Sequence, residues 1–297
     1  MKHRFNTAAT VLAAALAAVA PTAGAQTMQK VADSNKITVS YREASVPFSY
    51  LIGPGKAVGF AVDLTDAIVD SVRTKLGRPT LEVAYVPVTA QTRMPLLING
   101  TIDLECGSTT NNAARGKEVS FAISHFYTGT RLLTMKSSGI KNYADLANKT
   151  VASTAGSTNE TVLRKYNADK NLGLQIILGK DYGDSLRLVE DGQAGAFAMD
   201  DILLFGLMAN SKNPDSMEVV GDTLQVEPYG CMLRKDDPEF KALVDGTITQ
   251  LMKSGEFSRL YAKWFESPIP PKGINLNMPM GEPLKANLKE PSDKPAL

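Results

Sequence analysis

The sequence predicts an α/β fold made of two similar units, each with its own sheet. Two observations support this fold class. Strand-like and helix-like segments alternate along residues 37–106, and the same alternation returns along residues 150–208. A β-α-β order is typical of mostly parallel sheets that are covered by helices. A chain of 297 residues also has enough mass to form a core in each unit.

In the first unit, a strand is expected over residues 37–41, where apolar and polar residues alternate. A helix is expected over residues 63–76, because apolar residues recur every four positions and Gly77 follows. The other expected elements of this unit are a strand over 81–86, a helix over 93–99 and a third strand over 102–106.

The second unit begins with a strand over residues 150–152. A helix over 157–166 is predicted by a capping box, in which Ser157 is followed three residues later by Glu160. The other expected elements are a strand over 174–178, a helix over 185–191 and a strand over 194–199, after which Asp200 and Asp201 precede an apolar helix through Met208.

Two extended segments, residues 128–133 and 225–230, lie between and after the units. Asp237 and Pro238 predict the start of a helix, and the aromatic residues of 257–264 predict a second one. From Ser267 onward the chain holds 7 of its 16 prolines, so this tail is expected to run extended over the surface.

The overall charge excludes one class of partner. The 32 basic and 31 acidic residues give a net charge of +1, and no basic block is present, so no nucleic-acid partner is predicted. Of the two histidines, His3 lies in a segment that we expect to be removed, and His125 alone is too few for a histidine metal site or proton relay. We therefore predict no metal site.

Residues 1–25 have the form of a secretory signal peptide. Basic residues precede an uncharged run over 8–20, and the small residues of 23–25 suit a cleavage site after Ala25. The alternative, an uncleaved anchor helix, is less favoured because the run is short and Pro21 ends it. The mature product is expected to be soluble and exported.

Export changes the interpretation of the two cysteines, Cys106 and Cys231. In an oxidising compartment they are able to form one long-range disulfide. Two buried free thiols are the alternative, which only the distance between their Cα atoms decides.

Signatures of catalysis are missing. Gly53, Gly55 and Gly59 miss the dinucleotide-binding spacing because Val58 occupies the third glycine position, and no phosphate-binding loop, nucleophile elbow or H-E-x-x-H motif occurs. The sequence predicts no catalytic residue, no cofactor and no enzyme.

Polar residues do gather at strand-to-helix junctions, where open α/β sheets bind ligands. Hydroxyl, guanidinium and carboxylate groups together suit a zwitterion, although such residues also serve as helix caps. The candidates at this stage are Arg42, Arg93, residues 107–112, Arg115, residues 153–158 and Asp200.

Several ordered stretches of the mature chain resemble one family, the periplasmic family-3 solute-binding proteins of amino-acid ABC transporters, in its glutamate- and aspartate-binding branch. These stretches are residues 41–50, 103–112, 129–134, 199–201, 229–237, 263–265 and 268–272. The resemblance implies a two-lobe periplasmic-binding-protein fold of type II, with two hinge strands and the ligand in the interlobe cleft. It divides the chain into a signal peptide (1–25), lobe 1 (26–128 and 229–297) and lobe 2 (129–228).

The resemblance also implies the role of each site residue. Ser108, Thr110 and Arg115 would hold an α-carboxylate, with help from Ser157 of the opposite lobe. Asp200 would pair with the α-ammonium group, and Thr154 would contribute there. Arg42 and Arg93 would meet a side-chain carboxylate.

Two positions depart from the family pattern, Ala90 in place of serine and Tyr182 in place of histidine. Both belong to the side-chain end of the site. Either the tyrosine hydroxyl replaces the imidazole donor, or the specificity is altered. Retention of both arginines favours an acidic ligand, because two unpaired buried guanidinium groups are unfavourable.

The function expected from the resemblance is capture of glutamate or aspartate in the periplasm, by a monomer that delivers it to an inner-membrane ABC permease. One alternative is the same fold with a different amino acid or small carboxylate as ligand. Two others are an exported, dehydratase-like enzyme that processes amino acids and a sensor module of a membrane kinase.

Overall fold

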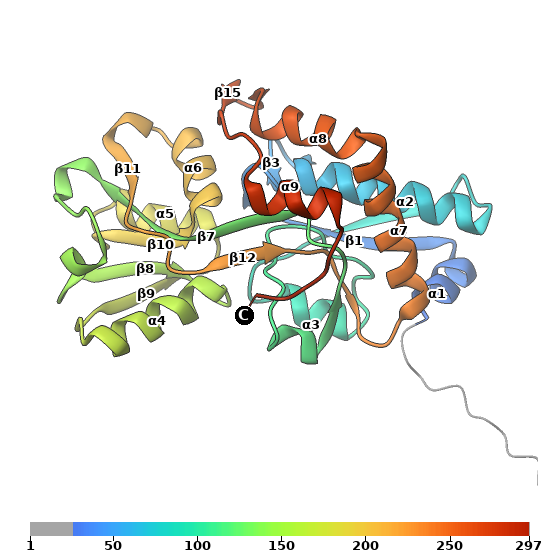
Figure 1. Ribbon diagram of the computed structural model, residues 1–297, viewed down its shortest axis with the longest axis horizontal. Coiled ribbons are helices and arrows are strands. Elements are labelled where there is room, and N and C mark those ends of the chain that lie inside the picture. The colour runs from blue at the N-terminus through green and yellow to red at the C-terminus, as the bar shows by residue number, and fades with distance from the viewer. Residues whose placement is uncertain (1–25, 297) are drawn as a thin grey trace, which may run out of the picture.

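The computed structural model describes residues 26–296, and the predicted signal peptide lies outside them. The chain folds into two lobes that are joined by two crossing strands (Figure 1). Within residues 26–296 no helix has the length and apolar character needed to cross a membrane.

The first lobe is built around the parallel pair of strands β1 (Lys36–Tyr41) and β5 (Glu82–Pro87), with Val39 opposite Tyr85. Helix α2 (Phe60–Leu76) connects them, and its apolar row is buried as the four-residue spacing predicts. The other elements of this part are α1 (Thr27–Ser34), β2 (Ala44–Ser45), β3 (Ser49–Leu51), β4 (Ala57–Val58), α3 (Arg93–Ile98) and β6 (Val119–Phe121).

The prediction of a third strand over residues 102–106 is wrong in one respect, because this segment forms only isolated bridges. Its backbone lies between Thr38 on one side and Met232 on the other, with Glu105 N donating to Met232 O at 3.1 Å. However, Thr38 N donates to the side-chain carboxylate of Asp103 at 3.0 Å instead of to a carbonyl group. The first lobe therefore holds several small sheets and not the single sheet that was expected.

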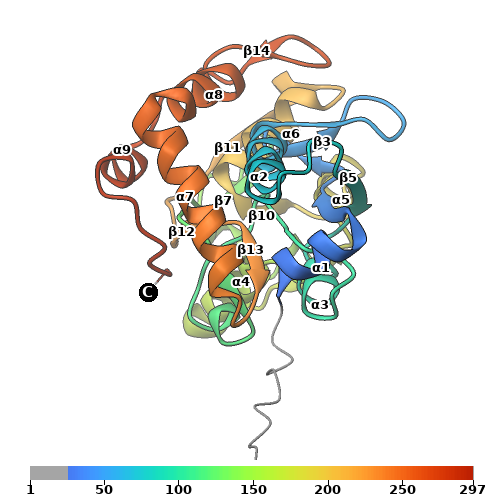
Figure 2. The same ribbon diagram turned by 90° about the vertical axis from the view of Figure 1, so that its right-hand side faces the viewer.

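The second lobe contains one six-stranded sheet in the order β11-β7-β10-β8-β9, with β12 also paired to β7. Helices α4 and α6 lie on opposite sides of this sheet (Figures 1 and 2). The elements are β7 (Phe126–Met135), β8 (Thr150–Thr154), α4 (Thr158–Lys170), β9 (Gln175–Gly179), α5 (Tyr182–Glu190), β10 (Ala196–Asp200), α6 (Asp201–Asn210), β11 (Met217–Val220) and β12 (Val226–Tyr229).

Strands β7 and β12 cross between the lobes, and they contain most of the two extended segments predicted from the sequence (Figure 1). They pair antiparallel, with Gly129 opposite Val226. A Cβ atom at Gly129 would lie 2.1 Å from Thr223 Cγ2 and 2.6 Å from Gln225 O. Only glycine therefore permits this close approach of the chain to the crossing strand.

Aromatic side chains join the crossing strands to the core of the first lobe. The Phe48 ring centroid lies 5.0 Å from that of Phe126, 5.3 Å from Tyr229 and 5.6 Å from Phe265. These edge-on contacts are favourable beyond the apolar area that they bury. The elements that complete the lobe are β13 (Met232–Arg234), α7 (Pro238–Ser254) and α8 (Glu256–Phe265).

The C-terminal tail runs over the surface, but it is not wholly extended as predicted. It contains β14 (Pro268–Ile269), β15 (Ile274–Asn275) and helix α9 (Glu282–Lys289), whose Leu284 is buried. Asn287 Nδ2 donates to Ser124 O at 2.6 Å. Ala296 N donates to Asn111 O at 2.9 Å, so the end of the tail lies along the segment that precedes Arg115.

Candidate functional site

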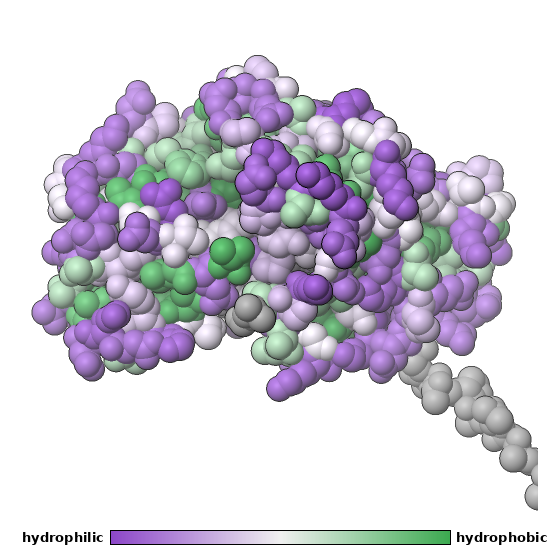
Figure 3. All heavy atoms as spheres, in the orientation of Figure 1, coloured by the Kyte–Doolittle hydropathy of each residue, from purple (hydrophilic) through white to green (hydrophobic). Residues whose placement is uncertain are grey.

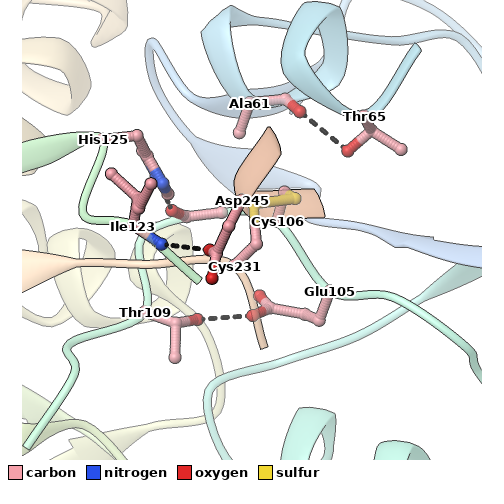
Figure 4. Close-up of a disulfide and its surroundings, with 10 residues drawn as sticks. Ala61, Thr65, Glu105, Cys106, Thr109, Ile123, His125, Cys231 and Asp245 are labelled. Carbon is pink, nitrogen blue, oxygen red and sulfur yellow. Dashed lines mark hydrogen bonds between the residues drawn. A yellow bond between two sulfur atoms is a disulfide. The ribbon is translucent and has the colours of Figure 1, made fainter. Parts of the chain in front are cut away.

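A disulfide bond joins Cys106 to Cys231, with an S–S distance of 2.08 Å and a Cα–Cα distance of 4.2 Å (Figure 4). It ties the start of the loop 107–112 to the chain that leaves β12. His125 lies beside it, fully buried, with Nε2 3.0 Å from Gly107 O. Burial lowers the pKa of His125 to about 4, so this side chain is neutral at physiological pH.

The loop 107–112 is held on both sides. Arg93 Nη1 donates to Ser108 O at 3.0 Å and to Thr109 Oγ1 at 2.6 Å. Thr109 Oγ1 in turn donates to the buried carboxylate of Glu105 at 2.7 Å. Asn111 N donates to Pro228 O at 2.8 Å, which fastens the loop to the crossing strand β12. The hydroxyl groups of the loop are thus presented from a rigid support.

Arg42 and Arg93 are both buried, with 3% and 2% of their surface exposed. Burial, and then the neighbouring charge of Arg42, lower the pKa of Arg93. Within residues 26–296 neither guanidinium group forms an ion pair, and Arg42 Nη1 and Arg93 Nε have no hydrogen-bond partner. Two adjacent buried cations of this kind suit an anionic group such as a carboxylate.

Tyr182, the first residue of α5, reaches this end of the site from the second lobe. Its hydroxyl lies 3.1 Å from Ser108 Oγ, and its ring centroid lies 4.7 Å from the guanidinium carbon of Arg42. Ser45 Oγ also donates to Ser108 Oγ at 2.8 Å. A cavity of about 310 Å³ adjoins these side chains; its lining includes Arg42, Glu43, Ala44, Pro87, Val88, Thr89, Thr92, Asp181 and Tyr182.

The lobes approach each other closely at Gly156. A Cβ atom there would lie 2.7 Å from Gln91 Cα and 3.1 Å from the carbonyl carbon of Ala90. Half-buried Arg115 spans the same gap, because Nη1 donates to Thr110 O at 2.9 Å and Nη2 donates to Gly156 O at 3.2 Å. Burial and the charge of Arg93 lower the pKa of Arg115 to about 10, at which it remains charged at neutral pH.

Two of the predicted hydroxyl residues make contacts within the second lobe. Ser157 caps α4, accepting from Glu160 N at 3.2 Å and donating to Thr154 O at 2.7 Å. The hydroxyl of Thr154 lies 2.7 Å from Ser185 Oγ. Their side chains therefore support the junction at the start of α4, and their hydrogen bonds connect them to each other, to Glu160 and to Ser185.

Asp200 ends strand β10 and is buried. The hydroxyl of Tyr229 donates to Asp200 Oδ2, while Oδ1 has no partner within residues 26–296. Burial and then the nearby charge of Glu227 raise the pKa of Asp200 well above its usual value. A cationic group would relieve both effects, which makes this carboxylate suited to an ammonium group.

The structure adds two residues that the sequence reasoning missed, Glu227 and Tyr229, and it gives Thr158, which lay within the candidate segment 153–158, a contact with one of them. Glu227 is fully buried on β12 and accepts hydrogen bonds from Thr110 Oγ1 at 2.5 Å and from Thr158 Oγ1 at 2.6 Å. One signal was available, namely an acidic residue within an extended segment that was otherwise expected to cross between the lobes. The contacts with Thr110 and Thr158, however, depend on residues more than 60 positions away.

Comparisons with known proteins find relatives that match most of the chain. The model of the bacterial extracellular solute-binding proteins, family 3, matches residues 37–267. The chain is 49% identical to the glutamate/aspartate import solute-binding protein of Escherichia coli strain K12, over 97% of both chains. It is 50% identical to the L-glutamate/L-aspartate-binding protein of Pseudomonas aeruginosa strain PAO1, over 91% of this chain and 90% of that protein.

Solved structures show the same architecture. A mutant of ArgBP from T. maritima matches with a TM-score of 0.71 at 28% identity, over 80% of this chain and 99% of that one. The ancestral amino acid-binding protein AncCDT-1, a precursor of cyclohexadienyl dehydratase, matches with a TM-score of 0.69 at 27% identity, with the same coverage. The fold is therefore the two-lobe, type II fold of periplasmic amino-acid-binding proteins, and the chain belongs to the bacterial extracellular solute-binding proteins, family 3.

Proposed function

We propose that the protein captures glutamate or aspartate in the cleft between its lobes and delivers it to an ABC permease in the inner membrane. The observation that carries this proposal is the distribution of buried charge. Arg42 and Arg93 form a cationic end, and Asp200 forms an anionic pole, each with a polar atom that lacks a partner within residues 26–296. A dicarboxylic amino acid has complementary groups for both.

The ligand's groups are assigned as follows. The α-carboxylate lies against the loop at Ser108 and Thr110 and pairs with Arg115, in the bidentate manner that a guanidinium group favours. The α-ammonium group pairs with Asp200, and the side-chain carboxylate meets Arg42 and Arg93. Ser157 and Thr154 complete the second-lobe side, and Tyr182 borders the side-chain end. This proposal includes lobe boundaries at 128/129 and 228/229.

Capture requires the lobes to close over the ligand. Contacts between the lobes at Ser108–Tyr182 and Arg115–Gly156 support this step, since they join the two halves of the site. A ligand that binds both halves shifts the equilibrium toward the closed form by its differential affinity for that form. Closure also removes water from the charged groups, which strengthens their interaction with the ligand.

The test is calorimetric titration of the purified mature protein with glutamate, aspartate, their amides and arginine. We expect glutamate or aspartate to bind with a Kd on the order of 1 μM, corresponding to about −8 kcal/mol. The amides should bind much more weakly, because they leave a buried guanidinium group without a carboxylate. Tight binding of arginine with no binding of either acid would contradict the proposal.

A second ligand class is favoured by one observation, that Ala90 and Tyr182 occupy the side-chain end in place of the expected serine and histidine. A different amino acid or small carboxylate would then be preferred over glutamate and aspartate. The same titration, extended to succinate and other small dicarboxylates, distinguishes the two. The curated relatives are transport proteins, which supports a carrier and not an enzyme.

We further propose that residues 1–25 direct export to the periplasm and that the mature protein is a monomer. The exposed large apolar side chains lie on separate elements, and the face in Figure 3 is largely hydrophilic, so no single apolar patch on that face suggests a stable partner copy. Mass spectrometry of the exported protein should find Gln26 at its N-terminus. Light scattering should give the mass of one mature chain. The exposed large apolar side chains mentioned above are those of Tyr85, Ile98, Leu178 and Val226.

A further inference from the structure

Glu227 occupies an unusual position, because it is a fully buried carboxylate on a strand that crosses between the lobes. One of its oxygens, Oε2, accepts hydrogen bonds from Thr110 Oγ1 at 2.5 Å and from Thr158 Oγ1 at 2.6 Å. The two threonine hydroxyl groups lie 3.2 Å apart. Thr110 belongs to the binding loop of the first lobe, and Thr158 is the first residue of α4 in the second lobe.

These three residues, the Glu227 cluster, connect directly to the proposed ligand site. The carbonyl group of Thr110 accepts from Arg115 Nη1, the group assigned to the α-carboxylate. Tyr229 lies two residues after Glu227 on the same strand, so the two side chains project from the same face, and Tyr229 donates to Asp200. The negative charge of Glu227 acts on both Arg115 and Asp200. It raises the pKa of Asp200, and it opposes the lowering of the pKa of Arg115 that burial causes.

We propose that Glu227 is a positioning residue that couples closure of the lobes to ligand binding. It acts through Thr110 and Thr158, and it is not assigned a contact with the ligand. The inference rests on the proposed function, in that closure over a ligand is what it stabilises. Glu227 and Thr158 both lie on the second-lobe side of the proposed 228/229 boundary, so separation of the lobes breaks the hydrogen bond from Thr110, while Thr158 holds the Glu227 carboxylate in place to accept it. A buried, charge-assisted bond of this kind favours closure.

The first experiment removes one hydroxyl group without changing the shape of the side chain. Thr158→Val is compared with Thr161→Val, an exposed position on the same helix. We expect Thr158→Val to raise the Kd for the acidic amino acid about tenfold, which is the effect of losing one hydrogen bond to a charged group. The increase should come mainly from faster dissociation, with the association rate little changed. Equal Kd values for the two variants would overturn the proposal.

A double-mutant cycle tests whether Thr158 acts through Glu227. In the Glu227→Ala background, Thr158→Val should have little further effect on the Kd, because its partner is already gone. Additive effects would overturn the proposal. Glu227→Gln keeps an acceptor oxygen and removes the charge, so it should restore part of the affinity that Glu227→Ala loses. If Glu227→Ala does not fold, the same cycle is measured with Glu227→Gln, in which Thr158→Val should weaken binding less than it does in the parent protein.

A readout without ligand separates this inference from the proposed function. Spin labels at Lys56→Cys and Lys170→Cys, exposed positions in the first and second lobes, report the distance between the lobes. If the parent protein binds no acidic amino acid, the proposed ligand is wrong, and the cluster is still tested by this distance. The closed population should be lower in Thr158→Val than in Thr161→Val. Equal populations would refute the role of Glu227.

Discussion

The hydroxyl of Tyr182 lies 3.1 Å from Ser108 Oγ, which joins the second lobe to the loop 107–112 of the first. The same ring covers the guanidinium group of Arg42, at 4.7 Å from its carbon to the ring centroid. A cation over an aromatic face is stabilised by the quadrupole of the ring. Tyr182 therefore contacts Ser108 across the gap between the lobes, and it also contacts Arg42, the residue that we assign to the side-chain carboxylate of the ligand.

We predict that Tyr182→His combined with Ala90→Ser changes ligand selectivity. Ala90→Ser adds one donor at the side-chain end and Tyr182→His exchanges a hydroxyl donor for an imidazole donor, so affinity for glutamate and aspartate relative to their amides should rise about tenfold, the effect of a hydrogen bond to a charged group. Tyr182→Phe is the control, since it keeps the ring over Arg42 and loses only the hydroxyl. Titration with a ligand panel gives the answer, and an unchanged ranking would show that these positions do not set specificity.

Removal of either charged residue assigned to the α-carboxylate or the α-ammonium group of the ligand should strongly weaken ligand binding. Arg115→Ala and Asp200→Asn should each weaken binding at least roughly hundredfold, because each leaves a charged group of the ligand buried without its partner. Arg164→Ala and Asp169→Asn, at exposed positions of α4, are the matched controls. Circular dichroism should show the fold retained. Parent-like affinity in Arg115→Ala or Asp200→Asn would remove that residue from the site.

The folded protein should lose stability as the pH falls from 6.5 to 4. Burial holds the pKa of His125 near 4 in the folded state, against 6.5 when exposed, so in this window the unfolded chain binds the extra proton. The sign follows from linkage, and the loss from this residue is on the order of 3 kcal/mol. His125→Gln, which cannot titrate, should flatten the dependence. Denaturant unfolding at several pH values measures how the free energy of unfolding depends on pH. The same dependence in the parent protein and in His125→Gln would contradict the lowered pKa of His125.

Loss of the disulfide should lower both stability and affinity. The bridge spans a sequence separation of 125 residues, and removing it by Cys106→Ala with Cys231→Ala should cost about 2–5 kcal/mol of unfolding free energy. The binding loop begins at Gly107, so the ligand Kd should rise as well. Reduction of the parent protein with dithiothreitol is a second route to the same state. Unchanged stability in both the variant and the reduced protein would contradict the prediction.

Much of the local structure could be predicted because it depends on neighbours in sequence. The apolar row of 63–76 becomes the buried face of α2, and the Ser157 cap begins α4, because helix periodicity and capping are local effects. The segment 102–106 shows the limit of such patterns. Its alternation indicated a strand, but the Asp103 carboxylate takes a backbone donor of Thr38 and breaks the ladder.

The sequence by itself predicted the two α/β units and two extended segments, and its resemblance to a family predicted that these segments cross between lobes and which charged residues form a ligand site. Tertiary structure alone decided which distant groups meet. It pairs Cys106 with Cys231 and brings Thr110 and Thr158 onto Glu227. The physical reason is that the crossing strands bring both lobes together at one place. The partner of a buried charge then depends on the packing of the two lobes, and no local pattern records that packing.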